Sequence, residues 1–222
     1  MLVVVVPAQD ERDRIGGVLQ RCRATLPDAV LLVVDSGSRD DTAEVALGEG
    51  AQVLSQQTSG YPGALLEGVQ AARAMGAHRL VVLDGDGQHP PEAAPELLAG
   101  LAHANWVTAS RAGTRSPSSM RRRVANRALA SLVALAGGGR WGDVTSGFHA
   151  WDRHALAVLG ERLDPEVADA NLRLSASRAG LVTLELPVAV SARPAGRSMH
   201  DGVAGLVNLQ KSLRGVWRAA RS

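Results

Sequence analysis

The fold is decided by residues Leu80–Glu92, which read LVVLDGDGQHPPE. An apolar run suited to a buried strand ends in Asp84 and Asp86, and Gln88 and two prolines precede a predicted helix. In an open parallel sheet, ligands bind at the carboxyl ends of the strands, so both carboxylates should lie in a ligand site. Two carboxylates at i and i+2 of a turn can hold one hard divalent cation, which keeps positions for water and substrate phosphate. The stretch predicts an α/β fold that handles a diphosphate.

Two other interpretations of this stretch exist. A bare Asp-x-Asp often consists of two solvated loop acids, and only its place at the end of an apolar strand argues otherwise. A calcium loop of the EF-hand type needs Gly at its sixth position and Glu at its twelfth. His89 and Pro95 stand at those positions, so the EF-hand interpretation is rejected.

The composition is that of a globular protein with a core of small aliphatic residues. The chain has 222 residues, of which 45% are apolar, and Cys22 is its single cysteine, expected in the core. No apolar run reaches the roughly 18–20 residues that span a bilayer. The N-terminus shows no basic segment or cleavage site, so no signal peptide is expected. These features predict a cytoplasmic location, with contact at the inner face of a membrane left open.

The charge is divided between the two halves of the chain. Residues 1–110 carry 7 basic and 14 acidic side chains, whereas residues 111–222 carry 17 and 8. Residues 110–142 contain seven arginines and no acid. A basic half indicates an anionic partner such as a diphosphate or an anionic membrane. Nucleic acid is not expected, because zinc-finger spacing and the aromatic RNA-binding signature are both missing.

Apolar runs alternate with helical periodicity along the chain. We expect strands at 2–6, 30–34, 52–55, 79–83 and 106–109, and an extended segment at 181–190 that Pro187 restricts to an edge or a bend. We expect a first helix that follows the turn at 7–11 and ends at about 26, and a second after 42 that Ser38 or Asp40 could cap. Further helices are expected at 64–75, 92–102, 120–136, 165–179 and 203–220. In the helix at 120–136, the side chains available for burial are Val124, Leu129, Leu132 and Leu135. This alternation predicts a mostly parallel, Rossmann-like sheet flanked by helices.

Five motifs occur in order over nearly the whole chain. They are Val4–Glu11 (VVVPAQDE), Val33–Thr42 (VVDSGSRDDT), Asp84–Glu92 (DGDGQHPPE), Asp143–Phe148 (DVTSGF) and the series Arg193, Gly196, Ser198. Together they resemble family 2 glycosyltransferases of the GT-A fold, especially the branch that makes dolichyl- or polyprenyl-phosphate sugars. The resemblance implies one domain at 1–200, with a nucleotide-sugar half at 1–110 and an acceptor half at 111–200. A basic amphipathic C-terminal helix at 201–222 would follow.

The resemblance also implies roles for individual residues. Around the base and ribose it places Pro7, Ala8, Glu11 and Asp35, and Gly37 and Ser38 in the same turn would line the nucleotide. Asp84 would lie near the ribose and the metal, and Asp86 and Gln88 would ligate Mg²⁺ or Mn²⁺. Arg111 would neutralise charge on the departing nucleoside diphosphate. The catalytic set implied is Asp86, Arg111, Asp169 and Arg193.

The chain departs from the family pattern at four places. Ser36 replaces a usual second Asp, and Tyr61-Pro62 replaces a usual Lys-Gly. Asn171 stands where many relatives have Glu, and Met199 where they often have Lys. The departure at Ser36 leaves the donor base (UDP, GDP or dTDP) open. The sequence does not reveal the sugar, the anomeric outcome or the oligomeric state either.

The acceptor can be argued from nucleophile chemistry. A sugar hydroxyl needs a general base, whereas a phosphate monoester is already mostly ionised near pH 7, since its second pKa is about 6. The acceptor side offers the arginines Arg121, Arg122, Arg123, Arg193 and Arg197 and the base candidates Asp143, Glu166 and Asp169. We expect a phosphorylated acceptor, with polyprenyl phosphate first and a small soluble phosphate second.

Three rival functions remain. One is transfer to a hydroxyl of a small metabolite. Another is a sugar-nucleotidyltransferase, whose glycine-rich basic N-terminal signature is missing, and the third is a non-catalytic nucleotide-sugar binder. Of the histidines, we expect His89 and His149 to be structural and regard His200 as the one to test at the metal.

Overall fold

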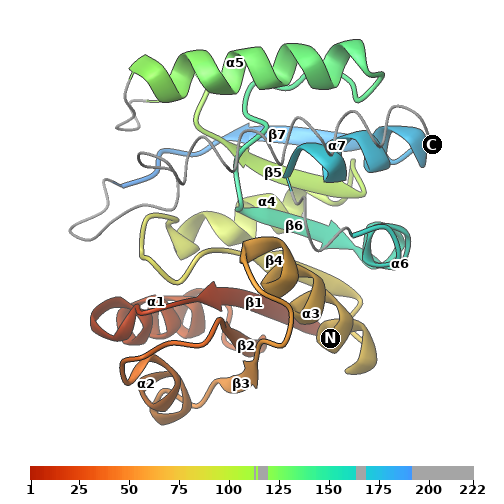
Figure 1. Cartoon of the computed structure of the whole chain (residues 1–222). Helices are drawn as coiled ribbons and strands as arrows, with labels where there is room; N and C mark the ends of the chain where they lie inside the picture. Colours follow the sequence, from red (N-terminus) through yellow and green to blue (C-terminus); the bar gives the residue numbers. More distant parts are fainter. Residues whose placement is uncertain (113, 115–119, 164–168, 192–222) are drawn as a thin grey trace.

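The protein is built around one mixed, seven-stranded sheet with helices on both faces (Figure 1). The computed structural model describes residues 1–112, 114, 120–163 and 169–191, and for residues 121, 122 and 169–171 only the backbone. The strands are β1 (Leu2–Ala8), β2 (Val30–Asp35), β3 (Gln52–Ser55), β4 (Arg79–Val82), β5 (Trp106–Ser110), β6 (His149–Asp152) and β7 (Thr183–Pro187). The helices are α1 (Arg12–Thr25), α2 (Thr42–Gly48), α3 (Tyr61–Ala74), η1 (Pro91–Ala93), α4 (Ala94–Gly100), α5 (Met120–Leu135), α6 (Arg153–Gly160) and α7 (Asp169–Arg178).

The sheet follows the order β3-β2-β1-β4-β6-β5-β7. Strands β1 to β4 are parallel, β5 and β7 are parallel to each other, and β6 is antiparallel to both of its neighbours. The prediction of a mostly parallel sheet flanked by helices is therefore confirmed. Pro187 ends β7, which lies at the edge of the sheet as expected.

The continuous valine run of β1 is explained by burial on both faces. Val3, Val4, Val5 and Val6 are all fully buried. Val4 and Val6 pack into the core under α1, α2 and α4, whereas Val3 and Val5 pack into the core under α3, α6 and α7. Strands covered on both faces are apolar throughout rather than alternating. Helix α3 comes so close to β1 that a Cβ on Gly68 would lie 2.4 Å from Cγ1 of Val5.

Strand β6 and helix α6 were not predicted. The strand is only four residues long, HAWD, and its first three residues are buried, so it shows no alternation of apolar and polar side chains. Asp152 then caps α6 by accepting a hydrogen bond from Ala155 N at 2.7 Å. Insertion of an antiparallel strand between β4 and β5 is a tertiary arrangement that local periodicity does not encode.

Several predicted boundaries and contacts were wrong. Helix α3 begins at Tyr61 rather than Ala64, and the helix expected at 92–102 is divided into η1 and α4. Ser38 does not cap α2, and Asp41, the residue directly before the helix, makes no side-chain cap bond. The Asp40 carboxylate instead accepts the N–H of Thr42 at 3.0 Å.

Helix α5 buries fewer residues than expected. Leu129 and Val133, one turn apart, are buried, but Val124, Leu132 and Leu135 are exposed, Leu135 to 84%. The physical reason is its position at one end of the molecule (Figure 1), where it packs on α7. The predicted C-terminal helix at 201–222 lies outside the described residues. Within the described parts of the chain, none of the helices has the length and apolar character needed to cross a bilayer.

Candidate functional site

The predicted ligand-binding turns meet at one edge of the sheet. Ala8 at the end of β1 pairs with Asp35 at the end of β2, and Val5 pairs with Val82 of β4. The three turns that follow these strands therefore start side by side. Gly85 in the third turn donates its N–H to the carbonyl of Pro7 at 3.1 Å, which ties β4's turn to β1.

The turns after β1 and β2 are hydrogen-bonded to each other. The bonds run from Ser36 N to Ala8 O (2.9 Å), from Asp10 N to Ser38 Oγ (3.0 Å), and from Glu11 N to Thr42 Oγ1 (2.9 Å). Asp10 adopts a φ of 53°, the single positive φ among the described non-glycine residues. The two turns thus form one rigid platform rather than two independent loops.

Within this platform, Asp35 is buried and its carboxylate is held locally. It accepts the N–H of Ser38 at 3.3 Å and the Ser38 hydroxyl at 2.5 Å. Gly37 between them has a φ of 73°, and a Cβ there would meet nothing within 4 Å. Open space beside a positive-φ glycine lets a ligand approach the backbone. Glu11 is also buried, but its carboxylate pairs with Arg14 at 2.6 Å.

The Asp84 turn is shaped by His89. The Asp84 N–H donates to Nδ1 of His89 at 3.1 Å, and the imidazole stacks on Phe148 with ring centroids 5.4 Å apart. His89 is buried, and its observed contacts support the structural role expected for it.

The Asp84 carboxyl group is partly enclosed. Its side chain is 33% exposed overall, although Oδ1 is buried and receives no well-aligned hydrogen bond from the described residues. Burial raises the pKa of Asp84, and the nearby charge of Asp86 acts in the same direction. His89, Arg111 and a hydrogen bond from Tyr61 oppose this rise in the pKa.

Asp86 and Gln88 complete the turn. The Asp86 carboxylate accepts the N–H of Gln88 at 3.0 Å across Gly87, whose φ is 76°. Gln88 also exchanges backbone and side-chain bonds with Ser191: its carbonyl accepts Ser191 N at 3.0 Å, and its Nε2 donates to Ser191 O at 3.1 Å. These bonds hold Ser191, which follows β7, against the turn.

The donor set suits a hard divalent cation. Asp84 and Asp86 offer carboxylate oxygens, and Gln88 offers an amide oxygen. In the part of the chain that the structure describes, there is no group of three or more His, Cys, Asp or Glu residues that could hold a metal ion. A cation here would take its other ligands from water and phosphate, as Mg²⁺ commonly does. The buried Oδ1 of Asp84 fits such a cation because it lacks a well-aligned donor.

Arg111 is engaged in an ion pair. Its Nε and a terminal nitrogen donate to the two oxygens of Asp143 at 2.6 and 2.8 Å, and the same terminal nitrogen donates to Thr145 Oγ1 at 2.6 Å. Burial alone would raise the pKa of Asp143, but the hydrogen bonds and charge of Arg111 lower it well below its usual range. Asp143 is therefore a weak general base.

Two residues that support this segment were missed by sequence reasoning. Glu185 of β7 accepts the N–H groups of Gly142 and Asp143 at 2.6 and 2.9 Å. Arg173 is fully buried, donates to the carbonyl of Asp143 at 3.1 Å, and lies 5.3 and 5.1 Å from the ring centroids of Trp106 and Trp141. The available signal for Arg173 was a single charge between Leu172 and Leu174 in a helical pattern.

His149 lies in the same buried region. Its Nδ1 lies 3.2 Å from Trp106 Nε1 and 3.0 Å from Thr108 Oγ1. Burial lowers the pKa of His149 well below its usual value, and the positive charge of Arg173 lowers it further. A neutral, fully buried histidine is consistent with the structural role expected for it.

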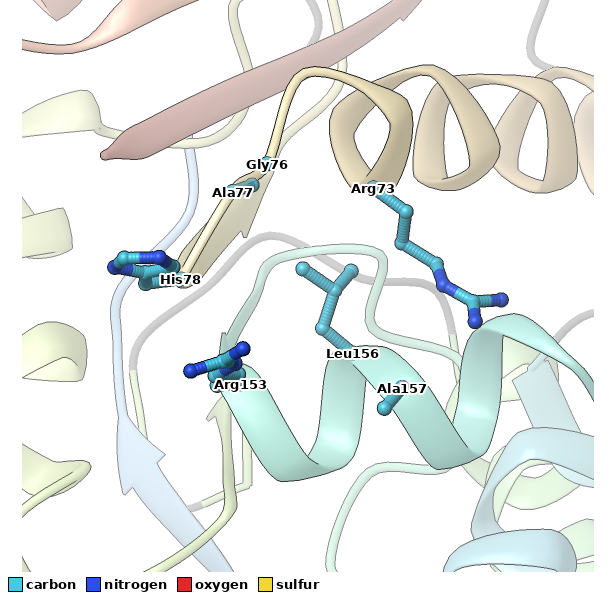
Figure 2. Close-up of a pocket in the computed structure, with 7 residues that line it drawn as sticks. All are labelled: Arg73, Gly76, Ala77, His78, Arg153, Leu156 and Ala157. Carbon is cyan, nitrogen blue, oxygen red and sulfur yellow. The ribbon is translucent and has the colours of Figure 1, made fainter.

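A shallow hollow lies at the other end of the strands, beside the start of β4 (Figure 2). Its lining comes from the end of α3, the residues before β4 and the start of α6. The lining residues are Arg73, Gly76, Ala77, His78, Arg153, Leu156 and Ala157. It contains none of the predicted site residues and lies away from the carboxyl ends of the parallel strands.

Some predicted site residues are not described. Arg193, Arg197, Met199 and His200 lie outside the described residues, as does Glu166, and the side chains of Asp169 and Asn171 are not described. The structure brings together Pro7, Ala8, Glu11, Asp35, Gly37, Ser38, Asp84, Asp86 and Gln88 at one edge of the sheet.

Comparison with known proteins gives consistent results. A family model described as glycosyl transferase family 2 matches residues 3–156. The dolichyl-phosphate hexose transferase of Haloferax volcanii is 31% identical, over 96% of this chain and 92% of that protein. The undecaprenyl-phosphate mannosyltransferase of Micrococcus luteus is 27% identical, over 100% of this chain and 98% of that protein. Glycosyltransferase AglJ of H. volcanii is 29% identical over 87% of this chain, which spans 64% of AglJ's length.

A solved structure shares the fold. Glucosyl-3-phosphoglycerate synthase of Mycobacterium tuberculosis, in complex with Mn²⁺, UDP and glucosyl-3-phosphoglycerate, superimposes with a TM-score of 0.73. The match covers 100% of this chain and 80% of that chain at 22% identity.

Proposed function

This chain belongs to glycosyl transferase family 2, and we propose that it transfers a sugar from a nucleotide-sugar donor to a phosphorylated acceptor with Mg²⁺ or Mn²⁺. The observation that carries the proposal is the junction of the Asp84–Gln88 turn with the interlocked turns after β1 and β2. Carboxylates for a cation and open backbone for a nucleotide meet there. The Mn²⁺ and UDP bound to the glucosyl-3-phosphoglycerate synthase support the same assignment.

The proposed donor site divides the work among its residues. Asp35, Gly37 and Ser38 would receive the base and ribose, beside Pro7, Ala8 and Glu11. Asp86 and Gln88 would hold the cation, with Asp84 between the cation and the ribose. The cation would supply positive charge against the diphosphate as it leaves. Arg111, fixed by Asp143, would add its charge without having to reorganise, which is the condition for effective electrostatic stabilisation.

The acceptor proposal follows from the state of Asp143. A carboxylate bound by two guanidinium nitrogens is a poor proton acceptor. Asp143 is therefore poorly suited to deprotonate a hydroxyl acceptor. A phosphate monoester needs cations rather than a base, since its second pKa is about 6. The names of the undecaprenyl-phosphate and dolichyl-phosphate relatives favour polyprenyl phosphate, and a small soluble phosphate is second. Arg193 and Arg197 are the proposed acceptor cations, and Asp169 is retained as a base candidate.

The domain assignment is part of the same proposal. Residues 1–110 would form the donor half and residues 111–200 the acceptor half of one domain, although both halves contribute strands to one sheet. Residues 201–222 would form a basic amphipathic helix that either packs on its own domain or a partner chain, or contacts anionic lipid. Co-sedimentation with anionic liposomes, with and without residues 201–222, tests this contact, and equal pelleting of both proteins would contradict it.

The function is tested by a matrix of donors and acceptors. Purified protein is incubated with UDP-, GDP- and dTDP-sugars, with Mn²⁺ or with chelator, and with polyprenyl phosphate, 3-phosphoglycerate or a neutral sugar. We expect metal-dependent transfer from one nucleotide class to a phosphorylated acceptor. Efficient transfer to the neutral sugar alone would contradict the acceptor proposal. Nucleotidyl transfer in place of sugar transfer would contradict the function as a whole.

A further inference from the structure

The hydroxyl group of Tyr61 reaches the donor site from a third direction. Tyr61 is the first residue of α3 and follows Gly60, whose φ is 86°. A Cβ built on Gly147 would lie 2.5 Å from Tyr61 Oη and 3.3 and 3.5 Å from the two oxygens of Asp84. Segments from the start of α3, the end of β4 and the entry to β6 therefore converge on one point.

Strand pairing explains why Gly147 is at this point. Val82 of β4 pairs with His149 of β6 in antiparallel register. Continuing this register by two residues places Asp84 opposite Gly147. Gly147 is buried and is not among the described glycines with positive φ. Its lack of a side chain thus serves the close approach of Tyr61 and Asp84, and not an unusual backbone conformation.

We propose that Tyr61 is a positioning residue for the donor, whose hydroxyl group holds the Asp84 carboxyl group in place above Gly147. This inference rests on the proposed donor site. Oδ1 of Asp84 is buried and lacks a well-aligned donor, so a carboxyl group held in this orientation would offer Oδ1 to the cation and its exposed oxygen to the ribose. A phenol is suited to this task because its rigid ring fixes the hydroxyl, and a neutral donor leaves the negative charge of Asp84 in place.

The proposal is tested by a double-mutant cycle with the full chain. The proteins are wild type, Tyr61→Phe, Gly147→Ala and the double variant. Isothermal titration with UDP, GDP and dTDP, each in the presence of Mn²⁺, gives the nucleotide Kd. Thermal unfolding without ligand reports separately on the fold. Gly17→Ala is the matched control, because a Cβ at Gly17 would meet nothing within 4 Å.

We expect Tyr61→Phe to weaken nucleotide binding about tenfold, the loss of roughly one hydrogen bond to a charged group. Its melting temperature should change by less than about 4 °C. Gly147→Ala should weaken binding at least as much, because its Cβ displaces Oη. In the Tyr61→Phe background, Gly147→Ala should add less than about a threefold effect, because the colliding atom is gone.

Other outcomes overturn the proposal. Wild-type affinity in Tyr61→Phe would show that the hydroxyl has no role in holding the donor. Fully additive effects in the double variant would show that Tyr61 and Gly147 act independently. If wild type itself binds none of the three nucleotides with Mn²⁺, the proposed donor site fails first, and the role of Tyr61 fails with it.

Discussion

Arg111 and Asp143 form a two-pronged ion pair in which Nε and a terminal nitrogen donate to separate carboxylate oxygens at 2.6 and 2.8 Å. The Asp143 side chain is 1% exposed and that of Arg111 is 34% exposed. The pair therefore buries one charge almost completely and leaves the other at the edge of the site. Asp143 therefore fixes the position of Arg111 and does not act as a proton acceptor.

The ion pair should make the protein sensitive to acid. Because the pKa of Asp143 is lower in the folded protein than the unfolded value of about 3.9, its contribution to stability is complete above that value. The contribution should decrease as the pH falls below about 4, toward the folded pKa. Urea unfolding between pH 2.5 and about 7 measures this loss, and Asp143→Asn should show a shallower decline in the free energy of unfolding. The exposed Asp28→Asn serves as the control and should follow the wild-type profile.

Removing Arg111 while Asp143 stays should lower the free energy of unfolding more than replacing Asp143 does. Arg111→Ala removes the guanidinium and leaves a buried carboxylate that accepts only the N–H of residue 111 and the N–H and hydroxyl group of Thr145 among the observed hydrogen bonds. We expect a loss of about 3 kcal/mol in the free energy of unfolding, the lower end for a broken buried pair. Arg111→Lys keeps the charge but loses the two-pronged geometry, so its loss should be smaller. Equal stability of the alanine variant and wild type would contradict this account.

Asp86 should be essential for metal-dependent donor binding but not for the fold. Its carboxylate accepts the N–H of Gln88, two residues further along the same turn. We expect Asp86→Ala to abolish Mn²⁺-dependent stabilisation by the nucleotide-sugar in a thermal-shift assay, with the ligand-free melting temperature nearly unchanged. Glu92→Gln, which alters an exposed carboxylate in η1 that pairs with Arg21, is the control and should keep the stabilisation. Wild-type activity of Asp86→Ala in Mn²⁺ would refute the metal assignment.

Cys22 should be unreactive in the folded protein. Cys22 lies in α1, and its thiol is fully buried in the core between α1 and the sheet. Burial raises the pKa of Cys22 to about 12. Only the thiolate reacts readily, so DTNB should label Cys22 at the rate of unfolding or local opening. The unfolded thiol ionises near pH 8.5, so this residue's stabilising effect should be full below that pH and decrease above it. Rapid native labelling at pH 8 would contradict the buried position.

Much of the fold was accessible from the sequence because the relevant signals are local. The valine run of β1 and the apolar run that ends at Asp84 each indicate a buried strand, and the polar residues directly after each run mark where the strand ends. The positions of Asp35 and Asp84 at one edge then follow from the geometry of a parallel sheet. That Asp35 and Asp84 lie close together could therefore be predicted without knowing how the side chains pack.

The acceptor side of the site was less predictable because its contacts join distant residues. Arg111 and Asp143 are 32 positions apart, and Glu185 meets Gly142 from 43 positions away. These contacts depend on the antiparallel return of β6, which no periodicity marks. Tyr61 was visible in the sequence as a departure from the family pattern, but its approach to Gly147 required the structure.

The last prediction concerns Arg193, whose role is proposed from the motif and the charge of the acceptor half. A phosphate acceptor is positioned by cations, so Arg193→Ala should raise the acceptor KM or lower turnover at least about tenfold, the effect of one charge-assisted hydrogen bond. Donor binding should be nearly unchanged, as measured by UDP and GDP titration with Mn²⁺. Arg79→Ala is the matched control, because Arg79 is exposed at the start of β4, at the opposite edge of the sheet from Asp84. An Arg193→Ala variant that loses donor affinity as much as acceptor turnover would place Arg193 at the diphosphate, and unchanged kinetics would remove it from the site.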